Sequence, residues 1–295
     1  MTVTCDEYVS SPMRVEDSQP LAWSAPAISL VIAVYQRPAL LELVLASLEV
    51  QTFTNFEVVL ADDGSGEEVR ELVERWVVRT GHRVRHVWQE NTGFRKTIIC
   101  NRAVARARAP YLVFIDGDCI LHHRFLERHF LRRRPGQALS GRRVMFDLPL
   151  TARLRVEDVT SLYVERPSAW WRHVKSHDRR NGIFLPAAFG LRGGYSTRYG
   201  ILGSNYSLFR SDFLSVNGYD ERIIGRGLED DNLRRRLLNA GLVVRALSQE
   251  AIQYHCHHEH SGFPHDAAAV VRWRETRETH TPHGVTRPPC SGDGH

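Results

Sequence analysis

Hydrophobic positions follow two alternating patterns through the first half of the chain. Short runs rich in apolar and β-branched residues, typical of strands buried on both faces, lie at residues 28–34, 56–61, 84–89 and 111–116. After each run, apolar residues recur at a spacing of three or four, which predicts helices over residues 38–48, 66–78, 96–108 and 122–134. Parallel neighbours need such crossover helices. The pattern therefore predicts an α/β fold with a mostly parallel, Rossmann-like sheet flanked by helices.

The remaining segments divide the chain into four parts. Residues 1–26 are polar and aperiodic, and residues 280–295 are rich in Pro, Gly, Ser and His, so we expect a flexible arm and a flexible tail. The strand–helix units define a first subdomain over residues 27–138. A second subdomain over residues 139–279 contains a helix that begins with acids and ends in Asn-Ala-Gly, a common helix stop.

The charge balance is mildly basic, with 39 Lys and Arg against 34 Asp and Glu and a net charge of +5. A nucleic-acid-binding protein concentrates its positive charge far more, so we expect no nucleic-acid partner. The five cysteines include no CxxC pair, and the N-terminus has no apolar signal core, so we expect free thiols and a cytoplasmic protein. The arginine excess leaves open a peripheral association with the inner face of a membrane, although no apolar run is long enough to span one.

Acidic residues follow two of the predicted strands. Asp62 and Asp63 follow the second strand, and Asp116 and Asp118, separated by Gly117, follow the fourth. Ligands of parallel sheets bind beyond the carboxyl ends of the strands. The first pair could accept hydrogen bonds from a base or a sugar there, and the second could bind Mg²⁺ or Mn²⁺. A helix cap for the first pair and a turn with two solvated acids for the second are the structural alternatives.

A further acidic triplet and a histidine-rich segment lie in the second half. Glu229, Asp230 and Asp231 begin the predicted helix, where acids complement the helix dipole or place a general base beside a substrate hydroxyl. Residues 254–260 contain four histidines, spaced too tightly for a zinc finger. One of these histidines could share a cation with Asp118, and a histidine-rich loop without a function is the alternative.

Two weaker features and two absences complete the candidate chemistry. Arg95 and Lys96 precede a predicted helix, where they favour a phosphate or are ordinary surface charges. Trp170 and Trp171 could stack on an acceptor sugar, pack in the core or contact a membrane. No GxGxxG follows the first strand, where VYQRPAL stands, and there is no P-loop. A dinucleotide-dependent oxidoreductase and a nucleotidyltransferase are therefore disfavoured.

The order of these motifs resembles a known family. VIAVYQR, QTFTNFEVVLADDGS and NTGFRKTIICNRAVARARAPYLVFIDGDC together resemble the N-terminal half of the family-2 glycosyltransferases, which have the GT-A fold. GSNYSLFRSDFLSVNGYDERIIGRGLEDDNLRRRLLNAG resembles the C-terminal segment shared with galactosyltransferases and polypeptide N-acetylgalactosaminyltransferases. The resemblance covers roughly residues 27–260. It implies a nucleotide-sugar-binding subdomain over residues 27–138 and an acceptor-binding, catalytic subdomain over residues 139–279.

The resemblance also implies an activity and its residues. The activity is the metal-dependent, inverting transfer of a sugar from a nucleotide-sugar donor, usually a UDP-sugar, to a hydroxyl of a glycan or glycolipid acceptor, in bacterial surface polysaccharide or lipopolysaccharide synthesis. The cofactor is Mn²⁺ or Mg²⁺. The implied residues are Ala33, Tyr35, Asp63, Arg95 and Asp116 for the donor, Asp118 with His255 or His258 for the metal, Asp230 as catalytic base, and Glu229 and Asp231 for donor or acceptor hydroxyls.

The sequence departs from the family pattern at two positions. Arg226-Gly227-Leu228 stands where a Trp-Gly pair often precedes the acidic motif, which bears on the specificity for sugar or acceptor. His257 stands where a Trp usually precedes the second histidine of the late motif, so His255 and His258 both remain candidate ligands. The alternative function is a catalytically inert sugar-binding or scaffold subunit on the same fold, against which the intact acids argue.

Overall fold

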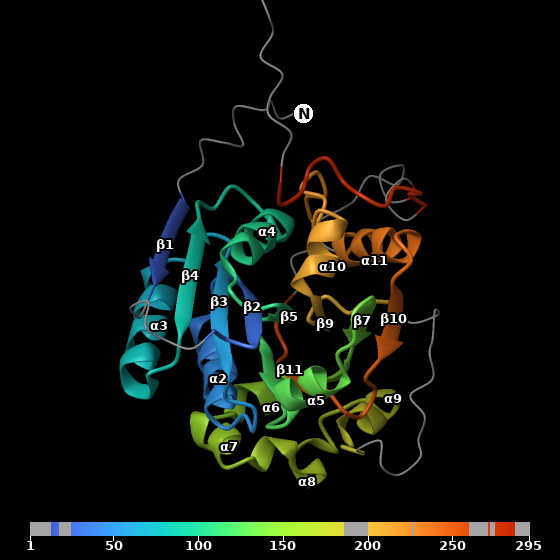
Figure 1. The fold of residues 1–295 in the computed structure, drawn as a ribbon. Coiled ribbons are helices and arrows are strands. Elements are labelled where there is room, and N and C mark those ends of the chain that lie inside the picture. The colour runs from blue at the N-terminus through green and yellow to red at the C-terminus, as the bar shows by residue number, and fades with distance from the viewer. Residues whose placement is uncertain are drawn as a thin grey trace, which may run out of the picture.

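The computed structural model describes residues 13–17, 25–185, 200–225, 227–259, 271 and 275–286. These residues form an eight-stranded mixed sheet with helices on both faces and a three-stranded sheet beside it (Figure 1). The fold is α/β with a mostly parallel central region, as the sequence predicts. Residues 186–199 and Arg226, which stands where the family often has a Trp-Gly pair, lie outside the described residues.

The large sheet brings the candidate acids to one edge. Its spatial order is β1 (Met13–Asp17), β4 (Val84–Gln89), β3 (Phe56–Asp62), β2 (Ile28–Val34), β5 (Tyr111–Asp116), β9 (Asn205–Phe209), β7 (Gln137–Ser140) and β10 (Val243–Ala246). β4, β3, β2 and β5 are parallel neighbours, whereas β9 runs antiparallel to β5 and β7. Ala33 pairs in register with both Ala61 and Asp116, so the carboxyl ends of β2, β3 and β5 meet.

Helices bury apolar side chains against both faces of this sheet. One core cluster contains residues of α2 (Pro38–Glu49), α3 (Glu67–Thr80) and α5 (Phe125–Arg132), and a second contains residues of α4 (Lys96–Arg106), α10 (Arg210–Ser215) and α11 (Glu229–Asn239). Within β2, Leu30 and Ile32 belong to the first cluster and Val31 to the second. Burial on both faces explains why the strand sequences are continuously apolar.

The small sheet is formed by three strands that the sequence pattern did not predict. Its order is β6 (Cys119–Leu121), β11 (Ile252–His255) and β8 (Arg142–Met145). Short helical turns follow β8 and lie together at the lower side of Figure 1: α6 (Leu148–Arg153), α7 (Val156–Thr160), η1 (Tyr163–Glu165), α8 (Pro167–Trp170), α9 (Ser176–Arg179) and η2 (Arg180–Gly182). His255 pairs in register with Cys119, which brings the end of β11 beside the Asp116–Asp118 turn.

Three expectations about local structure were wrong in part. Residues 13–17 of the predicted flexible arm form β1, which pairs antiparallel with β4. Residues 281–286 of the predicted tail pack against Asn217, whose side-chain amide donates to the carbonyls of Thr281 and Thr286, each at 2.7 Å. The predicted helix 122–134 is shorter, Phe125–Arg132, and the chain just before it, residues 119–121, pairs with β11. The rest of the arm before residue 25 and residues 287–295 lie outside the described residues.

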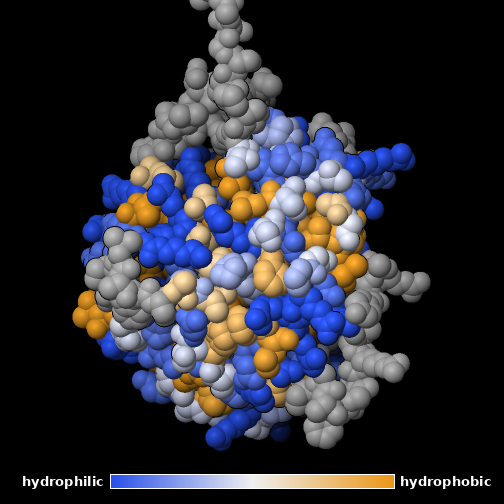
Figure 2. All heavy atoms as spheres, viewed as in Figure 1, coloured by the Kyte–Doolittle hydropathy of each residue, from blue (hydrophilic) through white to orange (hydrophobic). Residues whose placement is uncertain are grey.

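The surface in Figure 2 mixes hydrophilic residues with smaller hydrophobic groups. Among the described residues, no helix has the length and apolar content needed to cross a bilayer.

Candidate active site

A cavity of about 680 Å³, a typical volume for a small-molecule site, opens where β2, β3 and β5 end. The sequence-predicted residues that line it are Ala33, Tyr35, Asp63, Asp116, Asp118, Glu229, Asp230, His255 and His258. Four other predicted residues, Arg95, Asp231, Trp170 and Trp171, are not part of its lining. The fold therefore gathers most of the predicted chemistry from both halves of the chain into one site.

Asp63 lies at the end of β3 and is held from two sides. Its carboxylate accepts hydrogen bonds from the Gln89 side-chain amide at 2.6 Å and from the Arg95 backbone N–H at 2.7 Å. Burial raises the pKa of Asp63 to about 6, against the opposing effect of these hydrogen bonds. Arg95 thus reaches the predicted nucleoside side of the site through its backbone, while its guanidinium donates to the Glu90 carbonyl.

Asp116 forms an ion pair that sequence analysis did not predict. Lys96, the first residue of α4, places its ammonium 2.6 Å from Asp116 Oδ1. The next residue, Gly117, donates from its backbone N–H to the Ala33 carbonyl at 2.8 Å. A Cβ at Gly117 would lie 3.0 Å from a Val34 methyl group, so the close approach of the turn to β2 favours glycine between the two acids.

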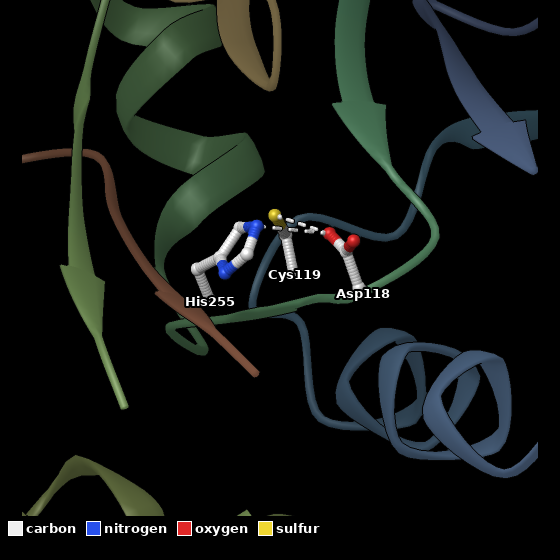
Figure 3. Close-up of side chains that lie close together, drawn as sticks. All are labelled: Asp118, Cys119 and His255. Carbon is white, nitrogen blue, oxygen red and sulfur yellow. Dashed lines mark hydrogen bonds and ion pairs between the residues drawn. The ribbon is translucent and has the colours of Figure 1, made fainter. Parts of the chain in front are cut away.

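Asp118 lies beside both predicted histidines. His258 Nε2 is 2.8 Å from Asp118 Oδ2, and His255 Nε2 is 3.6 Å from Asp118 Oδ1. The buried thiol of Cys119 also donates to Asp118 Oδ1, at 3.2 Å. Figure 3 shows Cys119 and His255 turned toward the Asp118 carboxylate. The backbone N–H of Cys256 donates to the Asp118 carbonyl at 2.9 Å, which fixes the turn against the end of β11.

The chemistry of this cluster fits a divalent cation. Although burial opposes it, the two neighbouring histidines hold the pKa of Asp118 well below its usual value, so the carboxylate is ionised. Burial lowers the pKa of His255, which keeps a ring nitrogen unprotonated at neutral pH. A carboxylate with one or two neutral imidazoles is a suitable donor set for Mn²⁺ and related ions, which also accept ligands from a substrate.

The acidic triplet divides between two environments. Glu229 and Asp230 line the cavity at the start of α11, whereas Asp231 lies outside the lining. Asp230 Oδ2 accepts from the Gly203 backbone N–H at 3.0 Å, and Oδ1 has no hydrogen-bond partner among the described residues. A Cβ at Gly203 would lie 2.1 Å from Asp230 Oδ2, so this contact requires glycine.

The position of Asp230 raises its pKa to about 8. Loss of water around the carboxyl is the main cause, the charge of Glu229 adds to it, and the ammonium of Lys96 opposes it. A carboxyl whose pKa lies near neutrality can both accept and release a proton in the working pH range, which is the property of a general base.

The tryptophan pair does not belong to this site. Trp170 is fully buried in the third core cluster, which includes Val144 and Tyr254, so the expectation that it stacks on an acceptor sugar was wrong. Trp171 is partly exposed at 44% and lies under the Arg179 guanidinium, 5.0 Å from the ring centroid. Trp170 packs in the core because its neighbours form the apolar layer beneath the small sheet.

Other residues that line the cavity were not predicted, because they belong to no recognisable motif in the sequence. They include Arg37, Asn91, Arg143 and Ser204, which reach the cavity from separate loops and strands. Lys96 carried a signal, as a basic residue at a helix start, but its partner Asp116 could be identified only in three dimensions.

A second group of possible metal ligands, outside the cavity, has a different chemistry. His122, His123 and Glu165 approach one another closely, with His122 Nε2 3.2 Å from Glu165 Oε2. The Nδ1 atom of His122 accepts the Arg124 backbone N–H at 3.1 Å. Nε2 of the neutral ring therefore carries the proton and donates to Glu165, which leaves no lone pair for a metal.

The fold is that of the GT-A class. The profile of glycosyl transferase family 2 matches residues 29–187, more than half of the chain, and the chain belongs to this family. Residues 188–261 match the profile described as the N-terminal domain of galactosyltransferase. The family and the segment type predicted from sequence are confirmed.

Known proteins similar to this chain include a glucosyltransferase and a polysaccharide synthase by name. Over 249 residues it is 29% identical to validoxylamine A glucosyltransferase of Streptomyces hygroscopicus subsp. jinggangensis, a match that covers 79% of this chain and 56% of that protein. It is 24% identical to chondroitin synthase of Escherichia coli, covering 77% and 34% respectively. The chain thus spans about half the length of the first relative and a third of the second.

A solved structure agrees in fold. The mannosyltransferase PcManGT from Pyrobaculum calidifontis, in complex with GDP-Man and Mn²⁺, superposes with a TM-score of 0.53 at 16% sequence identity, covering 85% of this chain and 62% of that one. At this identity the likeness concerns the arrangement of the elements.

Proposed function

We propose that the protein is a metal-dependent, inverting glycosyltransferase that moves a sugar from a nucleotide-sugar to a hydroxyl of a glycan or glycolipid acceptor. The observation that carries this proposal is the shared cavity. An acid–imidazole cluster suited to a divalent cation and a carboxyl with a pKa near neutrality line the same cavity, at the ends of the parallel strands. A catalytically inert sugar-binding subunit would not need this combination.

The donor would lie across the ends of β2, β3 and β5. Ala33, Tyr35 and Asp63 would border the nucleoside, with the ionised Asp63 carboxylate accepting from a base N–H. Asp116 would accept from ribose or sugar hydroxyls. Asp118, His255 and His258 would hold the cation, which when bound offsets the negative charge of the departing diphosphate.

The acceptor would approach from the side of α11. Asp230 would take the proton of the acceptor hydroxyl as its oxygen attacks the anomeric carbon, and the bond to the diphosphate would break in the same displacement. A single displacement inverts the anomeric centre. Glu229 lines the same wall and would orient hydroxyls of the donor or acceptor, and Asp231 would contribute from the adjacent position on the helix.

A UDP-sugar is the first donor to test, with UDP-glucose first in the panel because a relative is named as a glucosyltransferase. That relative's name refers to validoxylamine A, and the name of the second relative refers to chondroitin, a glycan. We propose a glycan or glycolipid acceptor in bacterial surface polysaccharide or lipopolysaccharide synthesis, at the cytoplasmic face of the membrane.

Nucleotide binding tests the donor site directly. UDP, GDP, dTDP, CMP and ATP are titrated calorimetrically and by thermal shift, with and without Mn²⁺, against the parent protein and Asp118→Ala. Stabilisation by UDP that needs Mn²⁺ and is lost in the variant supports the proposal, since a ligand that binds the folded state raises its stability. Stabilisation by another nucleotide changes the donor class. The absence of binding by every nucleotide contradicts the enzyme function and favours the inert scaffold.

A further inference from the structure

Lys96 occupies a position that simple helix chemistry disfavours. It is the first residue of α4, where the helix dipole repels a cation, and the first turn of this helix contains no acid. Its side chain is 14% exposed in the wall of the cavity, so its charge is also largely removed from water. A charge in such a place needs compensation from other elements.

The compensation comes from two segments far apart in the sequence. Asp116, at the end of β5, lies 2.6 Å from the ammonium, and Glu229 and Asp230, at the start of α11, add their charges. Although burial opposes it, these three acids raise the pKa of Lys96 above its usual value, so the ammonium stays charged. The ammonium of Lys96 therefore interacts both with Asp116, the expected donor-binding residue, and with Asp230, the expected catalytic base.

We propose that Lys96 is a positioning residue that orients Asp116 for the donor and, by its charge, keeps Asp230 able to ionise as the base. The inference rests on the proposed function and deepens it. Lys96, Asp116, Glu229 and Asp230 line the same cavity, where the charges of Glu229 and Asp116 oppose ionisation of Asp230 and that of Lys96 favours it. Three buried groups whose pKa values are raised, Cys100, Tyr206 and Tyr219, also interact with Asp230 and are neutral at neutral pH. Without Lys96, these two carboxylates, Glu229 and Asp116, would act on Asp230 and the opposing charge of the ammonium would be lost.

Two consequences separate this role from simple packing. Removal of the ammonium makes ionisation of Asp230 harder, so the acidic limb of the pH–rate profile moves to higher pH. Removal also releases Asp116, so donor affinity falls. If Lys96 only filled space, replacing it would not move the acidic limb of the pH–rate profile, and a charged replacement would behave like an uncharged one.

The sequence provides a matched control, because Lys175 is the other lysine of the chain and is exposed. The variants are Lys96→Met, Lys96→Arg and Lys175→Met. In the first measurement, which needs no substrate, thermal unfolding is followed at pH 9 for Lys96→Met, Asp230→Asn and the double variant. We expect Lys96→Met to lower Tm less in the Asp230→Asn background than in the parent, because one repelling carboxylate is gone. Equal losses in the two backgrounds contradict the proposal.

The second measurement is the pH dependence of kcat/KM for hydrolysis of UDP-glucose with Mn²⁺. We expect Lys96→Met to move the acidic limb upward by about one pH unit or more, Lys96→Arg to restore it in part, and Lys175→Met to match the parent. A profile for Lys96→Met that coincides with that of the parent overturns the proposal. If the parent neither binds UDP nor turns over the donor while the unfolding cycle shows coupling, the proposed function fails and the electrostatic link stands.

Discussion

His258 Nε2 lies 2.8 Å from Asp118 Oδ2, so a residue after the last strand contacts the turn that follows β5. A backbone hydrogen bond links the same residue to the end of β11, where the Cys256 N–H donates to the Asp118 carbonyl. The expected metal cluster therefore lies at the end of a strand pairing, β6 with β11, with His255 in β11 and with Asp118 and His258 in the adjoining turn and loop.

The histidines can be ranked by substitution. We expect His258→Ala and His255→Ala each to weaken Mn²⁺ binding in the presence of UDP by at least about tenfold, since each removes a donor beside Asp118. The measurement is a calorimetric Mn²⁺ titration. His257→Ala is the matched control, because His257 is exposed and does not line the cavity. If loss of either histidine leaves Mn²⁺ affinity at the parent value, that histidine is not a ligand.

Asp230→Asn should slow sugar transfer and at the same time stabilise the folded protein. Removing a general base slows the reaction by about 10²–10⁴-fold. Because the folded-state pKa of Asp230 is about 8, against 3.8 ordinarily, the unfolded chain ionises first as pH rises. Stability from the protonated carboxyl is therefore lost between about pH 4 and pH 8.

The neutral amide avoids this loss, so the gain in Tm of Asp230→Asn should grow from pH 5 to pH 8. Thermal unfolding at a series of pH values measures it. A gain that is constant or absent across this range would show that Asp230 titrates near its ordinary pKa.

The environment of Asp63 leads us to expect that nucleotide affinity depends on pH. Burial raises its pKa to about 6, and the ionised form is the one that accepts from a base N–H. Affinity for UDP should therefore be constant above about pH 7 and fall by about tenfold per pH unit well below pH 6. Calorimetry between pH 5 and pH 8 measures this dependence. Asp63→Asn should bind UDP more weakly and lose the dependence, and a variant that keeps the parent slope assigns the titration to another group.

Trp170 and Trp171 should behave in opposite ways when truncated. Trp170→Ala removes a fully buried side chain and should cost about 3–5 kcal/mol of unfolding free energy. Trp171→Ala loses a partly exposed ring and its contact with Arg179, which should cost about 1 kcal/mol or less. Urea unfolding measures both. Neither variant should change UDP affinity, and a loss of UDP binding in a folded Trp171→Ala would place that ring at the site after all.

Much of the fold could be predicted because its signals are local. The runs at 28–34 and 111–116 are apolar since the strands are buried on both faces, and this marks them as parallel strands within the sequence itself. The strand in the N-terminal arm could not be predicted in this way, because β1 is exposed along most of its length and is held by its pairing with β4. Asn217 likewise orders residues 281–286 through contacts across more than 60 positions.

By itself, the sequence determined the strand–helix order, the acids at the strand ends and the family of the chain, because each depends on residue type and short spacing. Tertiary structure alone decided that Trp170 packs in the core, that His258 lies nearer to Asp118 than His255 does, and that Lys96 pairs with Asp116. Those relationships depend on which segments the sheet brings together. The residue spacing within one segment does not indicate which distant segment it will contact, or which of its side chains that contact will bury.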